Sequence, residues 1–198
     1  MILILDSYDS FVYNLARYLT ELGREVQVRR SDTLTVDEVL AMVPAGIVLS
    51  PGPCTPREAG VGLELVGRLA TLGAAAPPLL GVCLGHQVVA EAFGGRLRPA
   101  RPPRHGIAVT LHRVGAPDPL LSGVPEPFTA GLYHSLAVDP EWLPPELEVS
   151  AVDEGGQIMA LRHRTLPIHT TQFHPESILT PEGRRIMANF NDRTGGSG

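Results

Sequence analysis

The sequence predicts an α/β protein built on an open, mostly parallel sheet with helices on both faces. Short apolar runs rich in Ile, Val and Leu recur along the first half of the chain, and segments with apolar residues at helical spacing separate them. Parallel neighbouring strands need a crossover connection, usually a helix, so this alternation is typical of a sheet covered on both faces. Prolines then interrupt the middle of the chain, which predicts antiparallel additions to the same sheet.

Strands and helices alternate through the first half of the chain. The expected strands are 1–5, 25–29, 46–50 and 79–82. Ser10 offers an N-cap hydroxyl for a helix that ends at Gly23, and Thr35 can cap a short helix through Val43. The expected apolar face of the first helix is Phe11, Leu15, Tyr18, Leu19 and Leu22. Two more helices are expected, at about 61–72 and from the residue after Cys83 to Phe93.

The second half of the chain has a different pattern. Short strands and turns are expected from Arg96 to Leu161, because prolines break any long helix there. Residues 167–173 return to a strand, and Thr180-Pro181-Glu182 predicts a last helix with a cap, a proline at the first helical position and an early acid. We expect one domain at 1–191 and a flexible tail at 192–198.

Composition excludes several classes of function. A net charge of -5 argues against sequence-independent nucleic-acid binding, which needs a broad basic surface. No apolar run is long enough to span a membrane and no signal-like segment opens the chain, so we expect a cytoplasmic protein. All 16 basic residues are arginine, which excludes a Schiff-base lysine. Two cysteines are too few for a disulfide framework, and we expect free thiols.

A candidate nucleophile lies where the fourth expected strand meets its helix. Cys83 follows an apolar strand, and Gly81 and Gly85 stand two residues before and after it. A nucleophile on a sharp strand-to-helix turn needs small residues at those positions. The helix N-terminus favours a thiolate, and the free amide of Leu84 can donate to an oxyanion. The alternative is a buried cysteine between two packing glycines.

A candidate base follows the last expected strand. His174 stands at the carboxyl end of an apolar segment, where ligands bind in open α/β sheets. Pro175 fixes the turn, and Glu176 can accept a hydrogen bond from the imidazole and hold its tautomer. The sequence therefore predicts a triad of Cys83, His174 and Glu176. The structural or surface interpretation is kept for His105, His112, His163 and His169. No spacing of histidines or cysteines supports a metal site.

The proline-rich turn at 51–56 also follows an apolar strand. Such a loop exposes backbone N–H groups in a rigid concavity that can stabilise negative charge on a reacting carbonyl. Most proline-rich turns have no catalytic role. This motif therefore supports a catalytic site only in combination with the Cys83 turn and the His174 and Glu176 pair.

Four motifs occur in order along the chain. They are Leu49-Ser50-Pro51-Gly52-Pro53, Gly81 to Gln87, Tyr133-His134-Ser135-Leu136, and Gln172-Phe173-His174-Pro175-Glu176-Ser177. Together they resemble the class I, triad-type glutamine amidotransferases, which implies a flavodoxin-like fold. The stretches Asp6 to Phe11 and Ser177 to Thr180 are similar to the glutaminase component of anthranilate synthase and of aminodeoxychorismate synthase.

The resemblance implies a role for each matching residue. Cys83 would attack the carboxamide of L-glutamine, with His174 as base and Glu176 orienting it. Gly52 and Leu84 would supply the oxyanion amides. The remaining contacts to glutamine would come from Gly52, Pro53, Cys54, Gln87, Ser135 and Leu136. Ammonia would pass to a separate chorismate-using synthase, component I of a hetero-oligomer. No cofactor is implied in this chain, whereas the partner would need Mg²⁺.

Two positions depart from the family pattern. Cys54 stands where glycine is usual, so we expect strain if that residue needs positive φ, and we hypothesise a disulfide to Cys83 under oxidation. At 105–108 the chain lacks the lysine and hydroxyl that many relatives carry. We expect the arginines before this stretch to face either an acidic surface of a partner or solvent. They are Arg96, Arg98, Arg101 and Arg104.

Other functions stay open at this point. The chain could serve another acceptor, such as the imidazole glycerol phosphate or guanine nucleotide pathways, although Asp6 to Phe11 argues against this. It could be a non-catalytic regulatory subunit, or a cysteine hydrolase that acts on peptides. The product, anthranilate or aminodeoxychorismate, depends on the other subunit.

Overall fold

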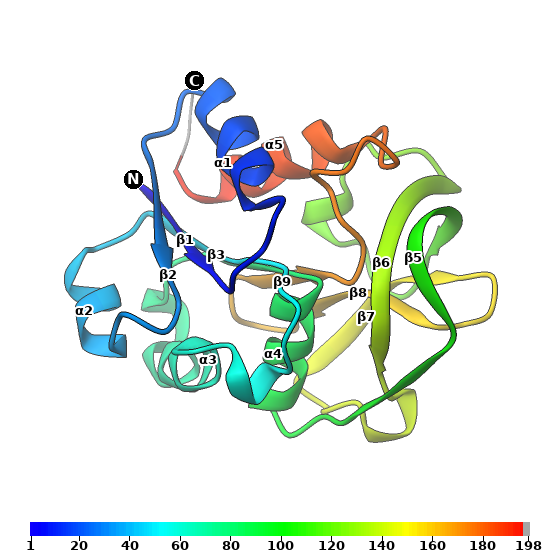
Figure 1. Cartoon of the computed structure of the whole chain (residues 1–198), viewed down its shortest axis with the longest axis horizontal. Helices are drawn as coiled ribbons and strands as arrows, with labels where there is room; N and C mark the ends of the chain where they lie inside the picture. Colours follow the sequence, from blue (N-terminus) through cyan, green and yellow to red (C-terminus); the bar gives the residue numbers. More distant parts are fainter. Residues whose placement is uncertain (196–198) are drawn as a thin grey trace.

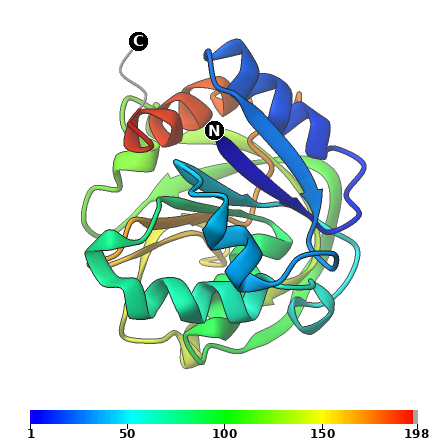
Figure 2. The same ribbon diagram turned by 90° about the vertical axis from the view of Figure 1, so that its left-hand side faces the viewer.

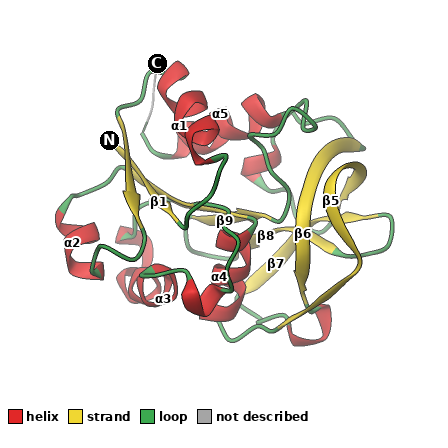
Figure 3. Cartoon of the chain, in the orientation of Figure 1, coloured by secondary structure: helices red, strands yellow, loops and turns green. Residues whose placement is uncertain are grey.

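The computed structural model describes residues 1–195, apart from the side chain of Arg101. Within this range, one nine-stranded sheet has the order β2-β1-β3-β4-β9-β8-β7-β5-β6. The parallel half contains β2 (Val26–Arg30), β1 (Ile2–Asp6), β3 (Gly46–Leu49), β4 (Leu79–Val82) and β9 (Ile168–Thr171). The antiparallel half contains β8 (Ile158–His163), β7 (Leu147–Asp153), β5 (Leu97–Arg113) and β6 (Phe128–Val138). Figures 1 and 3 show that this second half continues the same sheet.

Helices cover both faces of the sheet. One face carries α1 (Val12–Glu21) and α5 (Gly183–Arg193), and the other carries α2 (Val36–Ala41), α3 (Gly62–Leu72) and α4 (Leu84–Ala92). Figure 2 shows the same layers from a direction at right angles. Short 3-10 helices lie at Pro56–Glu58, Gly73–Ala75, Pro119–Leu121 and Pro140–Trp142. The α/β class and the antiparallel additions predicted from the sequence are confirmed.

Each layer buries its own apolar cluster against the sheet. Leu15 of α1 and Phe190 of α5 pack in one cluster, and Leu65 of α3 and Val89 of α4 pack in the other. All four side chains have an exposed fraction of 0%. Burying one such side chain contributes about 1.5–3 kcal/mol, so the strands that carry the site are held from both faces.

The first helix begins later than the sequence predicts. Its N-cap is Phe11, whose side chain makes no capping bond, so the expected cap at Ser10 is wrong. The loop before the helix is held by carboxylates instead. The amide of Phe11 donates to Asp9 at 3.0 Å, and the amide of Asp9 donates to Asp6 at 3.0 Å. Phe11 is 46% exposed, so it does not belong to the buried apolar face of the first helix, where the sequence predicts it.

The last helix also begins later than expected. Its N-cap is Glu182, so Thr180 is not the cap and Pro181 is not its first helical residue. Buried Thr180 instead accepts a bond from the amide of Gly131 at 2.9 Å and donates to the carbonyl of His174 at 2.7 Å. The helix extends to Arg193, past the expected boundary at 191.

The expected tail is only partly a tail. Thr194 is buried and donates to the carbonyl of Asn191 at 2.7 Å, and Arg24 donates to the carbonyl of Thr194 at 2.6 Å. Residues 196–198, where a frayed end is expected, lie outside the described residues. In residues 1–195, none of the helices has the length and apolar character that crossing a membrane requires.

One strand of the middle segment is longer than predicted. β5 has 17 residues, whereas short strands are expected there. Its register with β6 shifts between Pro99 and Arg104 and again between His105 and Ile107, where Gly106 has φ of 69°. These irregularities let a proline-rich segment stay paired, because bulges absorb the residues that cannot enter the ladder.

Candidate active site

The parallel strands bring three of the four motifs, and the stretch Asp6 to Phe11, to one edge of the sheet. Asp6 ends β1, Leu49 ends β3, Val82 ends β4 and Thr171 ends β9. The carboxyl ends of parallel strands lie at the same edge, and the strand order reverses between β1 and β3. Such an edge is where open α/β sheets bind ligands.

Cys83 lies on the sharp turn that the sequence predicts. It has φ of 51° and ψ of -95°, a conformation that side chains rarely adopt, and it is the N-cap of α4. A Cβ at Gly81 would lie 2.5 Å from the carbonyl oxygen of Gly85. A Cβ at Gly85 would lie 2.4 Å from the carbonyl oxygen of Leu49. Backbone cannot yield at either place, so both glycines are required by the turn.

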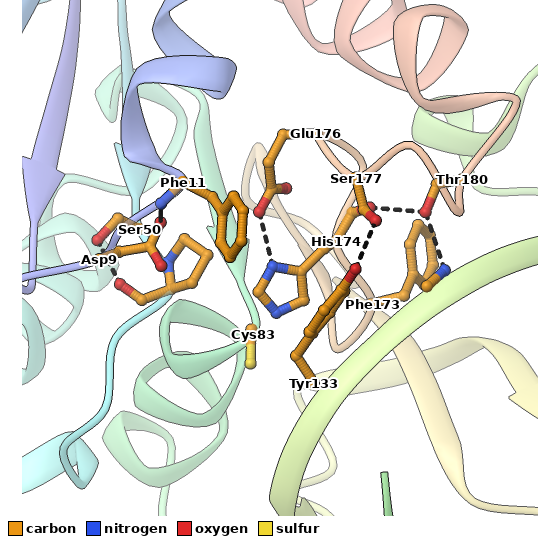
Figure 4. Close-up of polar contacts among 12 residues, drawn as sticks. Asp9, Phe11, Ser50, Cys83, Tyr133, Phe173, His174, Glu176, Ser177 and Thr180 are labelled. Atoms are coloured by element: carbon orange, nitrogen blue, oxygen red, sulfur yellow. Dashed lines mark hydrogen bonds and ion pairs between the residues drawn. The ribbon is translucent and has the colours of Figure 1, made fainter. Parts of the chain in front are cut away.

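His174 and Glu176 form a buried pair beside Cys83. Nδ1 of His174 lies 2.6 Å from Oε1 of Glu176, and both side chains are at most 5% exposed. Figure 4 shows the imidazole between Glu176 and Cys83. Burial lowers the pKa of His174, but the adjacent Cys83 and Glu176 side chains outweigh it and hold this pKa well above its usual value. This environment favours the protonated, imidazolium form of His174.

Aromatic rings support the base from the side. The rings of Tyr133 and His174 meet edge to face with centroids 4.9 Å apart, and the ring centroids of Phe11 and Tyr133 are 6.1 Å apart. Figure 4 shows these rings around the imidazole. The hydroxyl of Tyr133 lies 3.0 Å from that of Ser177, which follows Glu176. These rings also line an opening of about 290 Å³ that reaches His174 and Glu176.

The proline-rich loop approaches the nucleophile turn. A Cβ at Gly52 would lie 2.8 Å from the Leu84 side chain and 2.6 Å from the carbonyl of Ser7. The hydroxyl of Ser50 holds the start of this loop, because it accepts from the amide of Ser7 and donates to the carbonyl of Pro51. Leu84 opens α4, so its amide has no acceptor within the helix. The two expected oxyanion residues are therefore neighbours.

Two of the residues expected to contact glutamine, Gln87 and Leu136, bond to each other, whereas two others, Pro53 and Ser135, are exposed. Nε2 of Gln87 donates to the carbonyl of Leu136 at 3.1 Å, and the imidazole of His134 lies 2.8 Å from the same carbonyl. Burial and the nearby His174 lower the pKa of His134 to about 4, although the hydrogen bond that the ring donates to the carbonyl of Leu136 opposes this shift, so the ring is neutral at pH 7. Within residues 1–195, Cys54 and Ser135 make no side-chain hydrogen bond to the triad.

Cys54 fits its loop without backbone strain. Among residues 1–195, the non-glycine residues with positive φ are Tyr8, Val43 and Cys83, so Cys54 does not need the positive φ under which strain is expected. Its half-buried side chain packs against the apolar cluster under α3 and α4, and burial raises the pKa of this thiol. Both cysteines are free thiols, and the disulfide under oxidation stays a hypothesis.

Sequence reasoning missed three residues near the triad. Nε2 of Gln172 donates to Sγ of Cys83 at 3.5 Å, and Tyr133 packs on His174. Burial and the charge of Glu176 raise the pKa of Asp9 to about 6, although His174 and the amide of Phe11 oppose this shift. Each of the three stands inside a sequence motif, but only the strand register and loop path show which side chains point at the triad.

Most of the other histidines and arginines have partners within the chain. His169 lies 2.8 Å from Asp118, and His163 accepts two backbone amides. The arginines expected to face a partner or solvent have neighbours of their own. Arg96 stacks on Trp142, Arg98 lies 3.9 Å from Asp139, and Arg104 lies 3.4 Å from Asp153. The side chain of Arg101 lies outside the described part of the chain.

Comparison with known proteins identifies the family. The family model described as "Glutamine amidotransferase class-I" matches residues 3–193. The chain belongs to the class-I glutamine amidotransferase family. This amidotransferase is 51% identical over 194 residues to anthranilate synthase component 2 of Azospirillum brasilense, covering 98% of this chain and 96% of that protein. It is 45% identical to aminodeoxychorismate synthase component 2 of Klebsiella aerogenes, covering 98% and 100% of the two chains.

Solved structures agree with the fold of this amidotransferase. A proposed GMP synthase subunit from Thermoplasma acidophilum has a TM-score of 0.84 and 28% identity, covering 98% of this chain and 93% of that one. A glutamine amidotransferase from Thermotoga maritima has a TM-score of 0.79 at 12% identity, covering 99% and 98%, and supports the fold alone. The resemblance found in the sequence is therefore confirmed.

Proposed function

We propose that this chain is the glutaminase subunit of a chorismate-aminating synthase, with anthranilate as the first candidate product. The observation that carries the proposal is the buried pair of His174 and Glu176 beside the strained Cys83 turn. The relatives named component 2 support a heteromer with a separate synthase subunit. We place the complex in the cytoplasm, as the sequence predicts.

The first half of the proposed reaction forms a thioester. Sγ of Cys83, having given its proton to His174, attacks the carboxamide carbon of L-glutamine. The carbonyl π electrons move to oxygen, where the amides of Gly52 and Leu84 stabilise the negative charge. The oxyanion then collapses, the C–N bond breaks, and the nitrogen leaves with the proton of His174 as ammonia. Glu176 keeps the imidazole in the orientation that these transfers need.

The second half hydrolyses the thioester. His174 removes a proton from water, and the resulting hydroxide attacks the thioester carbon. The C–S bond breaks, and the sulfur leaves as the Cys83 thiolate or takes back the proton. The sum is glutamine and water giving glutamate and ammonia. The groups proposed to hold the glutamine are Gly52, Pro53, Cys54, Gln87, Ser135 and Leu136. All of these steps use side chains and backbone amides of this chain. We propose that Mg²⁺ is required by the partner subunit and not by this chain.

The acceptor is proposed from the most similar relatives. Identity to an anthranilate synthase component 2 is 51%, against 45% for an aminodeoxychorismate synthase component 2. A Bacillus subtilis relative, 45% identical, is named for both products. Aminodeoxychorismate is therefore the second candidate, and a chain of this kind can serve one partner or two.

The test is an assay of the complex recovered from the native cell. Chorismate is supplied with either glutamine or ammonium, and anthranilate is followed by fluorescence. Wild-type protein should support both reactions. The Cys83→Ala variant should lose glutamine-dependent synthesis and keep ammonium-dependent synthesis. Glutamine-dependent synthesis that survives in Cys83→Ala would contradict a catalytic role and favour a regulatory subunit. Glutamate release without any partner, at the rate of the complex, would favour a free-standing hydrolase.

A further inference from the structure

Gln172 contacts the sulfur of the proposed nucleophile. Its Nε2 donates to Sγ of Cys83 at 3.5 Å, an ordinary length for a hydrogen bond to sulfur. Gln172 and His174 thus both lie beside Cys83, the first through an amide and the second through its imidazole. Gln172 is fully buried, with an exposed fraction of 0%. Water therefore does not compete with the sulfur for this amide.

The orientation of the Gln172 amide is fixed by a second bond. Its Oε1 accepts from Nε2 of Gln87 at 3.2 Å, so its NH₂ group must face the other way, toward Cys83. Gln87 donates its second N–H to the carbonyl of Leu136 at 3.1 Å. The carbonyl of Leu136 can only accept, so it holds the NH₂ group of Gln87 in place, and that group in turn requires an acceptor oxygen from Gln172. A flipped Gln172 amide would place two NH₂ groups against each other.

The backbone around Gln172 is equally constrained. The amide of Cys83 donates to the carbonyl of Thr171 at 2.7 Å, and the amide of Gln172 donates to the carbonyl of Met159 at 2.8 Å. Val82 and Thr171 are direct partners in the parallel pairing of β4 and β9. The residue after Thr171 is therefore held next to the residue after Val82.

We propose that Gln172 is a catalytic residue of the glutaminase reaction, stabilising negative charge on Sγ of Cys83 while it orients Gln87 toward the substrate. The proposal rests on the proposed function, because Cys83 must be the nucleophile. A buried N–H donor favours the thiolate that attacks the carboxamide, and it stabilises the same sulfur again when the thioester breaks. With both N–H groups of Gln87 in use, Oε1 of Gln87 is the atom left to accept from glutamine.

The test compares two replacements of Gln172. Gln172→Met removes the donor at similar length, and Gln172→Glu replaces the amide by an acceptor that repels a thiolate. At pH 7 we expect alkylation of Cys83 by iodoacetamide to slow by about tenfold in Gln172→Met and more in Gln172→Glu. The kcat of glutamine hydrolysis in the complex should fall by a similar factor. KM for glutamine should rise by less, because Gln87 keeps its bond to Leu136.

Matched controls separate the local effect from a general one. Gln27, in the edge strand β2, takes the same two replacements far from the site and should change neither rate by more than about twofold. The alkylation assay needs neither glutamine nor a partner, so it reports on Gln172 even if the proposed function fails. An alkylation rate within twofold of wild type in a folded Gln172→Met protein would overturn the proposal.

A second measurement covers the case in which both Gln172 variants fail to fold. The side-chain amide of Gln172 can be followed by ¹⁵N NMR in wild-type protein and in Cys83→Ala. Loss of the sulfur acceptor should shift the Nε2 protons of Gln172 and leave those of Gln27 unchanged. Identical Gln172 signals in the two proteins would mean that no bond to Cys83 exists.

Discussion

Val82 and Thr171 are direct partners across the parallel strands β4 and β9. The amide of Cys83 continues the ladder by donating to the carbonyl of Thr171 at 2.7 Å. This register brings the turn that carries Cys83, the proposed nucleophile, against the segment that carries His174 and Glu176, although these residues lie far apart in the sequence. A slip by one residue would face each side chain to the opposite side of the sheet and separate the triad.

Replacement of Glu176 by glutamine should weaken the base. The carboxylate contributes to the raised pKa of His174, so a neutral amide should lower that pKa and make the imidazole a weaker base. We expect kcat/KM for glutamine to fall by about 10²- to 10⁴-fold, with the alkaline limit of activity displaced to lower pH. Steady-state kinetics from pH 6 to 10 measures both effects.

The same variant carries a stability signature. A histidine whose pKa is raised by folding adds stability fully below its unfolded pKa of 6.5, and this contribution is lost as pH rises through the raised value. The free energy of unfolding should therefore decline above about pH 6.5 more steeply in wild type than in Glu176→Gln. Parallel stability profiles for the two proteins would contradict the raised pKa of His174.

Replacement of Gly85 by alanine should damage the nucleophile turn. The added Cβ would lie 2.4 Å from the carbonyl oxygen of Leu49, which belongs to the backbone of β3. We expect a loss of about 1–3 kcal/mol or more in urea unfolding, together with loss of glutaminase activity. Gly67 is the matched control, since it lies within α3 and its Cβ would meet nothing within 4 Å. Gly67→Ala should raise stability by about 0.5–1 kcal/mol, and an equal loss in both variants would contradict the clash.

Replacement of Thr180 by valine should release the loop that carries the base. The hydroxyl bridges the amide of Gly131 and the carbonyl of His174, and valine keeps its shape without either bond. Two buried polar groups would lose their partner, which costs about 1–3 kcal/mol. Thermal unfolding measures the change. Thr20→Val is an exposed control with an expected change within about 0.5 kcal/mol, and a Thr180→Val protein as stable as this control would show that the bridge is dispensable.

Replacement of Asp9 by asparagine should change how stability depends on pH. Burial and the charge of Glu176 raise the pKa of Asp9 to about 6 from 3.8, so the protonated form is favoured in the folded protein. The stability that this form contributes is present below about pH 3.8 and is lost as pH rises through about 6. Asparagine stays neutral and can still accept from Phe11.

We therefore expect Asp9→Asn to gain stability relative to wild type between pH 4 and pH 7. The gain should be under about 1 kcal/mol, because the side chain is only half-buried and solvent screens its neighbours. Thermal unfolding at several pH values measures it, with the exposed Asp192→Asn as control. A difference between Asp9→Asn and wild type that does not vary with pH would rule out this titration.

The sequence predicts the parts of the site that depend on local chemistry. Gly81 and Gly85 mark the turn at Cys83 because no other residue fits there, and the two-residue offset from His174 to Glu176 is enough to pair them. Helix starts were predicted less well. Ser10 and Thr180 have the right side chains for caps, but carboxylates hold the first loop and tertiary bonds occupy the Thr180 hydroxyl. Local propensity cannot anticipate bonds to distant segments.

By itself the sequence determined the α/β class and the alternation of strand and helix, and it predicted the three triad residues, because apolar periodicity and glycine sterics act over a few residues. Tertiary structure decided which side chains meet. The register of β4 and β9 places Gln172 on the sulfur of Cys83, and the path of β6 brings Tyr133 against His174. Such contacts join residues far apart in the chain, and they exist only once the whole sheet has packed between its two layers of helices.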